Sequence, residues 1–95
     1  MSRRDEYVRT MQNKLEEWNV EIDNLAARAD GVKTDVKLEY KELIETLKVK
    51  QASARKKLDE LQKGGENAWE DLKSGSELAR DALREAIDTA KSRFK

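Results

Sequence analysis

The sequence contains no cysteine, no histidine and no proline, and aromatic residues make up only 5% of its 95 residues. Without cysteine, neither a disulfide framework nor a thiolate metal site can form, and the redox compartment is left open. Without histidine, the chain lacks the commonest acid–base catalyst and the commonest metal ligand. We therefore expect a protein that is not an enzyme and that needs no metal, cofactor or small-molecule substrate.

The chain also lacks an excess of charge of either sign and a long apolar run. Its 20 basic and 20 acidic residues cancel, so it has no basic excess of the kind that holds nucleic acid through phosphate contacts. No stretch approaches the ~18 apolar residues that a bilayer-spanning helix needs, and residues 1–6 are not followed by the apolar segment of a secretory signal. These absences predict a cytoplasmic protein without a nucleic-acid partner.

The composition that remains is typical of long helices. Charged residues make up 42% of the chain and hydrophobic residues 37%, a mixture found in helical and in disordered chains, so periodicity has to decide. Steps of three or four residues from Val8 to Leu72 reach nineteen positions, of which only Gln51 and Gly65 lack an apolar side chain. This stripe, called the seam below, predicts helices that bury one face against each other.

The spacing along the seam predicts a coiled coil. Steps of three and four alternate from Val8 to Val36, which is a heptad pattern. Two extra steps of four, at Val32-Val36-Tyr40 and Leu43-Leu47-Gln51, predict stutters in that pattern. The predicted helix–helix interface consists of Val8, Met11, Leu15, Trp18, Ile22, Leu25, Val32, Val36, Tyr40, Leu43, Leu47, Leu58, Leu61, Ala68, Leu72, Ala79, Ala82 and Ala86.

Glycines give the candidate helix ends. Lys63-Gly64-Gly65 is the strongest break, because two glycines cost about 2 kcal/mol inside a helix and glycine is common just past a helix end. Asp30-Gly31 is ambiguous. A single glycine costs only about 1 kcal/mol, and the seam passes through it unbroken from Ala29 to Val32. A helix that continues through Gly31 is therefore favoured.

Two all-α architectures follow for a single helical domain over residues 1–95. In the favoured one, a helix over 3–62, a break at 63–65 and a helix over 66–94 form an antiparallel coiled coil, and half of the long seam needs a partner chain. In the alternative, an extra turn at Asp30-Gly31 divides the chain into helices 3–29, 34–62 and 66–94, which form a three-helix bundle. The nearly equal lengths of the three segments support this alternative.

Two other features are candidate functional sites. The last predicted helix carries Trp69, Ile87 and Phe94 beside small residues. A membrane-surface helix is a less favoured interpretation of it than tight helix packing, because its polar face has no basic excess. The basic run over residues 48–57 contains no acid. We interpret this run as a solvated helix face, because no aromatic or glycine-rich partner for nucleic acid lies near it.

Several stretches resemble a known group of proteins. Residues 68–75 (AWEDLKSG), the closing Ser92-Arg93-Phe94, and the segments 4–8 and 15–19 are similar to small bacterial coiled-coil proteins of unassigned function. Members of that group resemble apolipoprotein-like or stress-associated helical proteins, so the resemblance implies a helical fold without catalytic or ligand residues. Asp30-Gly31 departs from the uninterrupted helical pattern of the group.

Together these observations predict a non-enzymatic structural or interaction protein of the bacterial cytoplasm. It is expected to self-associate through the seam as a homodimer or a larger helical bundle. The alternative is a peripheral lipid-surface or stress-protective helical protein.

Overall fold

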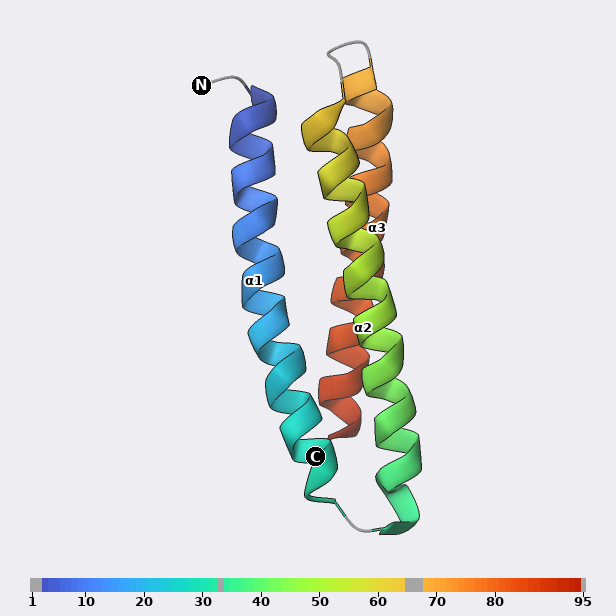
Figure 1. Ribbon diagram of the computed structural model, residues 1–95. Helices are drawn as coiled ribbons and strands as arrows, with labels where there is room; N and C mark the ends of the chain where they lie inside the picture. The colour runs from blue at the N-terminus through green and yellow to red at the C-terminus, as the bar shows by residue number, and fades with distance from the viewer. Residues whose placement is uncertain (1–2, 33, 65–67, 95) are drawn as a thin grey trace.

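The chain folds into three helices that lie side by side in a rod of 51 × 19 × 18 Å, as the computed structural model shows (Figure 1). The structure describes residues 3–32, 34–64 and 68–94. Helix α1 spans Arg3–Asp30, α2 spans Thr34–Lys63 and α3 spans Trp69–Arg93. No strand occurs in the described residues, so the predicted all-α class is confirmed.

The favoured continuous helix over residues 3–62 is wrong, and the chain adopts the three-helix alternative. α1 ends at Asp30 and α2 begins at Thr34. The turn folds α1 back along α2, so the chain buries its own seam, and the gain from that burial exceeds what a straight helix of one isolated chain offers. Predicted and observed bounds of α1 and α2 agree within one residue. The predicted start of the third helix, residue 66, and residue 65 of the predicted break lie outside the described residues.

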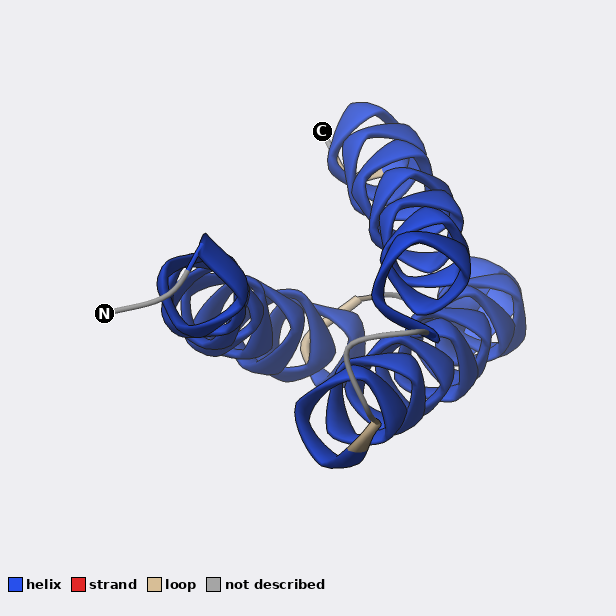
Figure 2. Cartoon of the chain, turned by 90° about the horizontal axis from the view of Figure 1, so that it is seen from above, coloured by secondary structure: helices blue, strands red, loops and turns tan. Residues whose placement is uncertain are grey.

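The central helix of the bundle is α2. It runs antiparallel to both neighbours and packs closely on each of them, whereas α1 and α3 approach each other less closely (Figure 2). Two-sided packing requires a wider apolar stripe on α2 than on a helix with one neighbour. The α1–α3 contact is the least extensive of the three helix contacts.

The buried face of α1 follows the heptad pattern without interruption. Seven residues at alternating steps of three and four are each at most 6% exposed: Val8, Met11, Leu15, Trp18, Ile22, Leu25 and Ala29. This spacing keeps the stripe on one side of the helix, where burial of each large apolar side chain stabilises the fold by about 2 kcal/mol.

In α2 the most deeply buried residues differ at one position from those that the sequence suggested. Ile44 is 6% exposed and lies closer to the core than the predicted Leu43, which is only partly buried. Counted through Ile44, the steps to Leu47, Gln51 and Ala54 alternate three, four and three, and the second extra step of four moves to Tyr40–Ile44, directly after the first. Leu43 packs beside this stripe and widens it.

The buried face of α3 contains one polar residue. Leu83, Ile87, Ala90 and Phe94 are at most 3% exposed, and Ser76 is 1% exposed. The neighbouring Gly75 is half-buried. No side chain caps the first turn of α3, but Glu70 and Asp71 in that turn complement the helix dipole.

Candidate interaction surfaces

The predicted helix–helix interface is gathered into one core, to which all three helices contribute. Half of its eighteen residues are buried, and these are Val8, Met11, Leu15, Trp18, Ile22, Leu25, Leu47, Leu58 and Leu61. The other half are partly buried, and these are Val32, Val36, Tyr40, Leu43, Ala68, Leu72, Ala79, Ala82 and Ala86. None of the eighteen is exposed, so within one chain the seam is already covered.

Other core residues were absent from that predicted interface. Ile44 could have been found four residues after Tyr40 and three before Leu47, but it competes with the adjacent Leu43. Ser76 gave no hydrophobic signal. At the C-terminal end the predicted interface also omitted residues whose spacing placed them on the inward face, namely Leu83, Ile87, Ala90 and Phe94.

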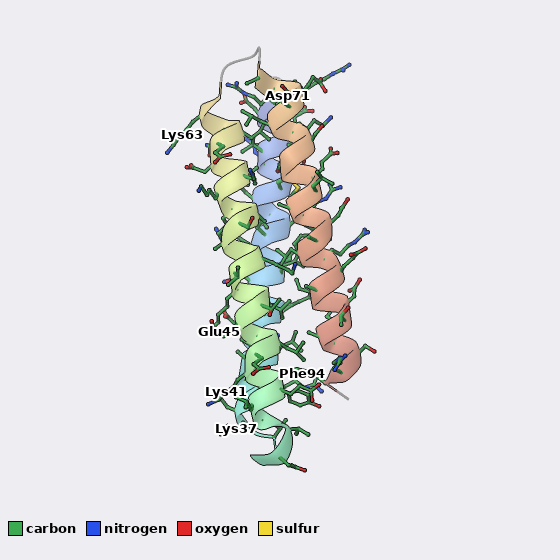
Figure 3. The ribbon with its side chains drawn as sticks, turned by 90° about the vertical axis from the view of Figure 1, so that its right-hand side faces the viewer. Lys37, Lys41, Glu45, Lys63, Asp71 and Phe94 are labelled. Atoms are coloured by element: carbon green, nitrogen blue, oxygen red, sulfur yellow. The ribbon has the colours of Figure 1, made fainter. Side chains whose placement is uncertain are left out.

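Aromatic packing closes the end of the bundle that contains the α1–α2 turn. The rings of Tyr40 and Phe94 stack with centroids 4.2 Å apart, and the Tyr40 hydroxyl donates a hydrogen bond of 2.8 Å to the Arg93 carbonyl. Phe94 points toward α2, whereas Lys41 and Glu45 point away from the bundle (Figure 3). Arg28 of α1 donates a hydrogen bond to the Phe94 carbonyl, so the three helices meet at this end.

The turn at this end is backed by two short-range hydrogen bonds. The Gly31 N–H donates to the Arg28 carbonyl at 3.1 Å, and the Val32 N–H donates to the Ala29 carbonyl at 3.5 Å. Both bonds join residues three apart, as in a 3₁₀ turn at a helix end. No described glycine has a positive φ, so Gly31 is not held in a left-handed conformation.

The opposite end, at the α2–α3 turn, is packed more tightly. A Cβ atom on Gly64 would lie 2.5 Å from Leu72 Cδ1 and 3.1 Å from the Glu60 carbonyl oxygen. The Gly64 N–H donates to that Glu60 carbonyl at 2.9 Å, and Arg4 of α1 donates to the Gly64 carbonyl. A larger residue at this position would require the Leu72 side chain to move and the Glu60 carbonyl to shift slightly.

An aromatic pair bridges α1 and α3 near this end. The rings of Tyr7 and Trp69 meet edge to face with centroids 5.7 Å apart, and the Lys73 ammonium lies 5.6 Å from the centroid of each ring. Large rings of this kind fill the wider spacing between α1 and α3. Trp69 is half-buried, as expected from its place beside the seam.

Two hydroxyls are buried beside this aromatic pair. The side-chain oxygens of Tyr7 and Ser76 are shielded from solvent, and neither makes a hydrogen bond of good geometry. Burial raises the pKa of Tyr7 above its ordinary value of 10.0, and the nearby Ser76 hydroxyl partly opposes this rise. A buried hydroxyl without a good partner destabilises the fold. These two groups are therefore a polar defect in the core rather than a reactive site.

A groove runs between α1 and α2. It encloses about 500 Å³ and is lined by Gln12, Asn13, Leu15, Glu16, Arg55, Leu58, Asp59 and Gln62. Its apolar floor, Leu15 and Leu58, is at most 5% exposed, and its walls are amides and charges of both signs. A small-molecule site usually combines an accessible apolar surface with a few convergent polar groups, and this groove offers little apolar surface to a ligand.

The basic run of α2 does not form one surface. Arg55 lines the groove with α1. Lys57 lies on the other side, where its Cδ is 3.9 Å from the Cβ position of Gly75 in α3, and it pairs with Glu60. Helical spacing places Lys56 between them on the outer face. Nucleic-acid binding through this run is therefore less well supported than a solvated surface.

The exposed large apolar residues are scattered. Val20 lies on α1, Leu38 and Val49 on α2 and Leu78 on α3, each more than half exposed. By helical spacing each lies opposite the buried face of its own helix. Single exposed apolar residues are ordinary on a protein surface, so they do not define a docking site.

Two kinds of functional feature are absent from residues 3–32, 34–64 and 68–94. No cluster of three or more acidic residues is arranged to hold a metal ion. None of the helices there combines the length and apolar character needed to cross a bilayer.

Comparison of the chain with models of protein families, with curated proteins and with solved structures finds no match. The resemblance to small bacterial coiled-coil proteins stays a prediction that these comparisons do not test. The function is therefore inferred from the seam and from the two turns that determine which chain buries it.

Proposed function

We propose that the protein is a non-enzymatic structural or interaction module that works by self-association of its helices. The observation that carries this proposal is the continuity of the seam across the first turn. Ala29, Val32 and Val36 follow at steps of three and four residues, although α1 ends at Asp30. The same apolar face can therefore be buried within one chain or between two.

The make-up of the grooves and of the core in the described residues is that of a helix-packing module. The described grooves offer no convergent set of titratable groups of the kind that catalysis requires. The core contains apolar side chains and one serine among its buried residues. Specific recognition by such a molecule depends on helix packing, with surface charges selecting partner and orientation.

The oligomeric mass in solution tests the proposal. Size-exclusion chromatography with light scattering should show a monomer of 11.0 kDa in equilibrium with a dimer, whose fraction rises with concentration. A mass that stays at that of one chain up to about 1 mM would overturn self-association, because even an interaction of about −4 kcal/mol half-populates the complex there.

The second candidate, a lipid-surface or stress-protective helical protein, has a structural cost. Of the residues expected to enter the headgroup layer, Ile87 is 1% exposed and Phe94 3% exposed, and Trp69 is half-buried. Binding a membrane through them requires the bundle to open. The packing of α1 on α2 is less extensive than that of α3 on α2, which favours α1 as the helix that would leave.

Flotation with anionic vesicles distinguishes this second candidate. Lipid binding predicts that the chain co-floats and that its tryptophan emission shifts to shorter wavelength as Trp69 enters the headgroup layer. Failure to co-float would exclude the candidate while leaving self-association unaffected.

A further inference from the structure

The first turn is built so that it can become part of a helix. Its two hydrogen bonds already join Gly31 to Arg28 and Val32 to Ala29. Their conversion to the four-residue pattern of an α-helix needs only local rotation of the backbone. A Cβ atom on Gly31 would meet nothing closer than the Arg28 carbonyl oxygen at 3.7 Å, and no described glycine has a positive φ, so the turn does not require glycine at this position.

Of the two outer helices, α1 adjoins this turn, and it packs on α2 somewhat less extensively than α3 does. Besides the seam, α1 is tied to the rest of the bundle by the Tyr7–Trp69 ring contact, by the hydrogen bond from Arg4 to the Gly64 carbonyl and by a few further polar contacts. Asn19 accepts a hydrogen bond of 2.7 Å from Gln51 of α2, Glu21 pairs with Lys91 of α3, and Arg28 bonds the Phe94 carbonyl. The contacts within the α2–α3 hairpin do not involve α1. These two helices pack extensively on each other and form their own ion pairs, such as Glu39 with Arg93.

We infer that two copies of this chain form a dimer by exchanging α1. In each copy, α1 and α2 join through Gly31 into one helix over residues 3–63, about 90 Å long at 1.5 Å per residue. The α1 half of each long helix then packs on the α2–α3 hairpin of the second copy. This inference rests on the proposed self-association and specifies its geometry.

The exchange recreates the contacts of the single bundle. Two long helices running antiparallel place each α1 beside the α2 of the other copy, in the same orientation that α1 has within one chain. The seam stays in register because its steps continue through the turn. Only the backbone near Gly31 differs, and exchange of an identical element across a short connection is a low-cost route to a dimer.

A matched pair of hinge variants tests the inference. Gly31→Ala should strengthen dimerisation on the order of 30-fold, because alanine favours a helix about fivefold over glycine at each of the two hinges. The turn itself tolerates this alanine. Insertion of Gly-Ser-Gly-Ser after Gly31 should abolish the dimer, because a long flexible connection lets α1 fold back on its own chain.

Cross-linking then shows which chain supplies α1. Since the chain has no cysteine, paired cysteines can be added and linked with a short bis-maleimide in the isolated dimer. The pair Glu21→Cys with Lys91→Cys joins α1 to α3 and should give a covalent dimer. The control pair Glu39→Cys with Arg93→Cys joins α2 to α3 and should give a linked single chain.

The outcomes separate the two proposals. A dimer in which the Glu21→Cys and Lys91→Cys pair links only within one chain would overturn the exchange of α1 and leave self-association standing. Absence of any dimer, for Gly31→Ala as well as the unaltered chain, would overturn both. Equal dimerisation by Gly31→Ala and the insertion variant would also contradict the hinge, because the two changes act on it in opposite directions.

Discussion

The two turns of the bundle both contain glycine, but packing gives these glycines different roles. At the α2–α3 turn, a Cβ on Gly64 would lie 2.5 Å from Leu72 Cδ1. At the α1–α2 turn, a Cβ on Gly31 would lie 3.7 Å from the Arg28 carbonyl oxygen, which is an ordinary contact distance. The first of these turns is closed by its neighbours. The second contains short-range backbone hydrogen bonds and has no such tight contact at its glycine, so we place the change of connectivity there.

The comparison extends to the cores beside the two turns. Leu61 near the α2–α3 turn is 0% exposed, and Val36 near the α1–α2 turn is only partly buried. A fully buried side chain loses both its transfer free energy and its packing contacts when it is truncated. Four predictions test this difference between the ends, in order of decreasing effect.

The largest expected effect is truncation of Leu61. Leu61→Ala should lower the free energy of unfolding by about 3 kcal/mol, whereas Val36→Ala at the other end should lower it by about 1 kcal/mol. Urea denaturation followed by circular dichroism measures both. Equal losses would show that the two ends are packed alike and would remove the contrast between them.

The next effect contrasts the glycines themselves. Gly64→Ala should destabilise the fold by about 1–2 kcal/mol, because the added methyl group forces Leu72 and the Glu60 carbonyl apart. Gly31→Ala should leave the stability of the single bundle almost unchanged, because a Cβ there makes only an ordinary contact with the Arg28 carbonyl oxygen. Melting temperatures at low concentration, where the monomer dominates, compare the two. Similar destabilisation by both would mean that the two turns do not differ in packing.

The third prediction concerns the buried Ser76 hydroxyl near the α2–α3 turn, where the expected change in the free energy of unfolding is smaller. Ser76→Ala should stabilise the protein by about 1 kcal/mol, because it removes a buried hydroxyl that lacks a good hydrogen bond. Ser74→Ala, at an exposed position of the same helix, corrects for the helix propensity of alanine. A loss of stability relative to this control would mean that the Ser76 hydroxyl is well bonded in solution.

The smallest effect depends on pH. Because burial raises the pKa of Tyr7 in the folded state, the unfolded state loses its proton first, and folding stability falls as the pH rises above about 10. The Tyr7→Phe variant has no hydroxyl at this position, so its folding stability does not fall with pH for this reason. The stability of Tyr7→Phe minus that of the unaltered chain should therefore be small near pH 7 and larger near pH 11. A difference that is constant with pH would contradict a buried Tyr7 hydroxyl.

Much of the fold could be predicted from periodicity, and the reasons differ along the chain. The buried residues of α1 follow the heptad pattern because this helix buries a single narrow stripe. In α2, which has a helix on either side, adjacent Leu43 and Ile44 both pack inward, so a one-stripe pattern chose the less buried of the two. Ser76 could not be found because a polar residue gives no hydrophobic signal.

The turn at Gly31 could not be decided from the sequence for a physical reason. The straight and the folded arrangements bury the same seam residues, so the apolar pattern is equally compatible with both. What separates them is whether the partner of α1 belongs to the same chain, and this depends on concentration and on the small free energy of the turn. The interface residues were therefore predictable, whereas the identity of the chain that covers them was not.

The exchange of α1 is tested most directly by one distance within a single chain of the dimer. Spin labels at residues 19 and 51, on a chain mixed with an excess of unlabelled chain, report only the distance between α1 and α2 of that chain. In the monomer these residues are hydrogen-bonded neighbours, so the distance is short. In the dimer fraction we predict about 48 Å, since about 32 residues at 1.5 Å each separate them along a straight helix. A short distance in the dimer fraction would contradict the exchange.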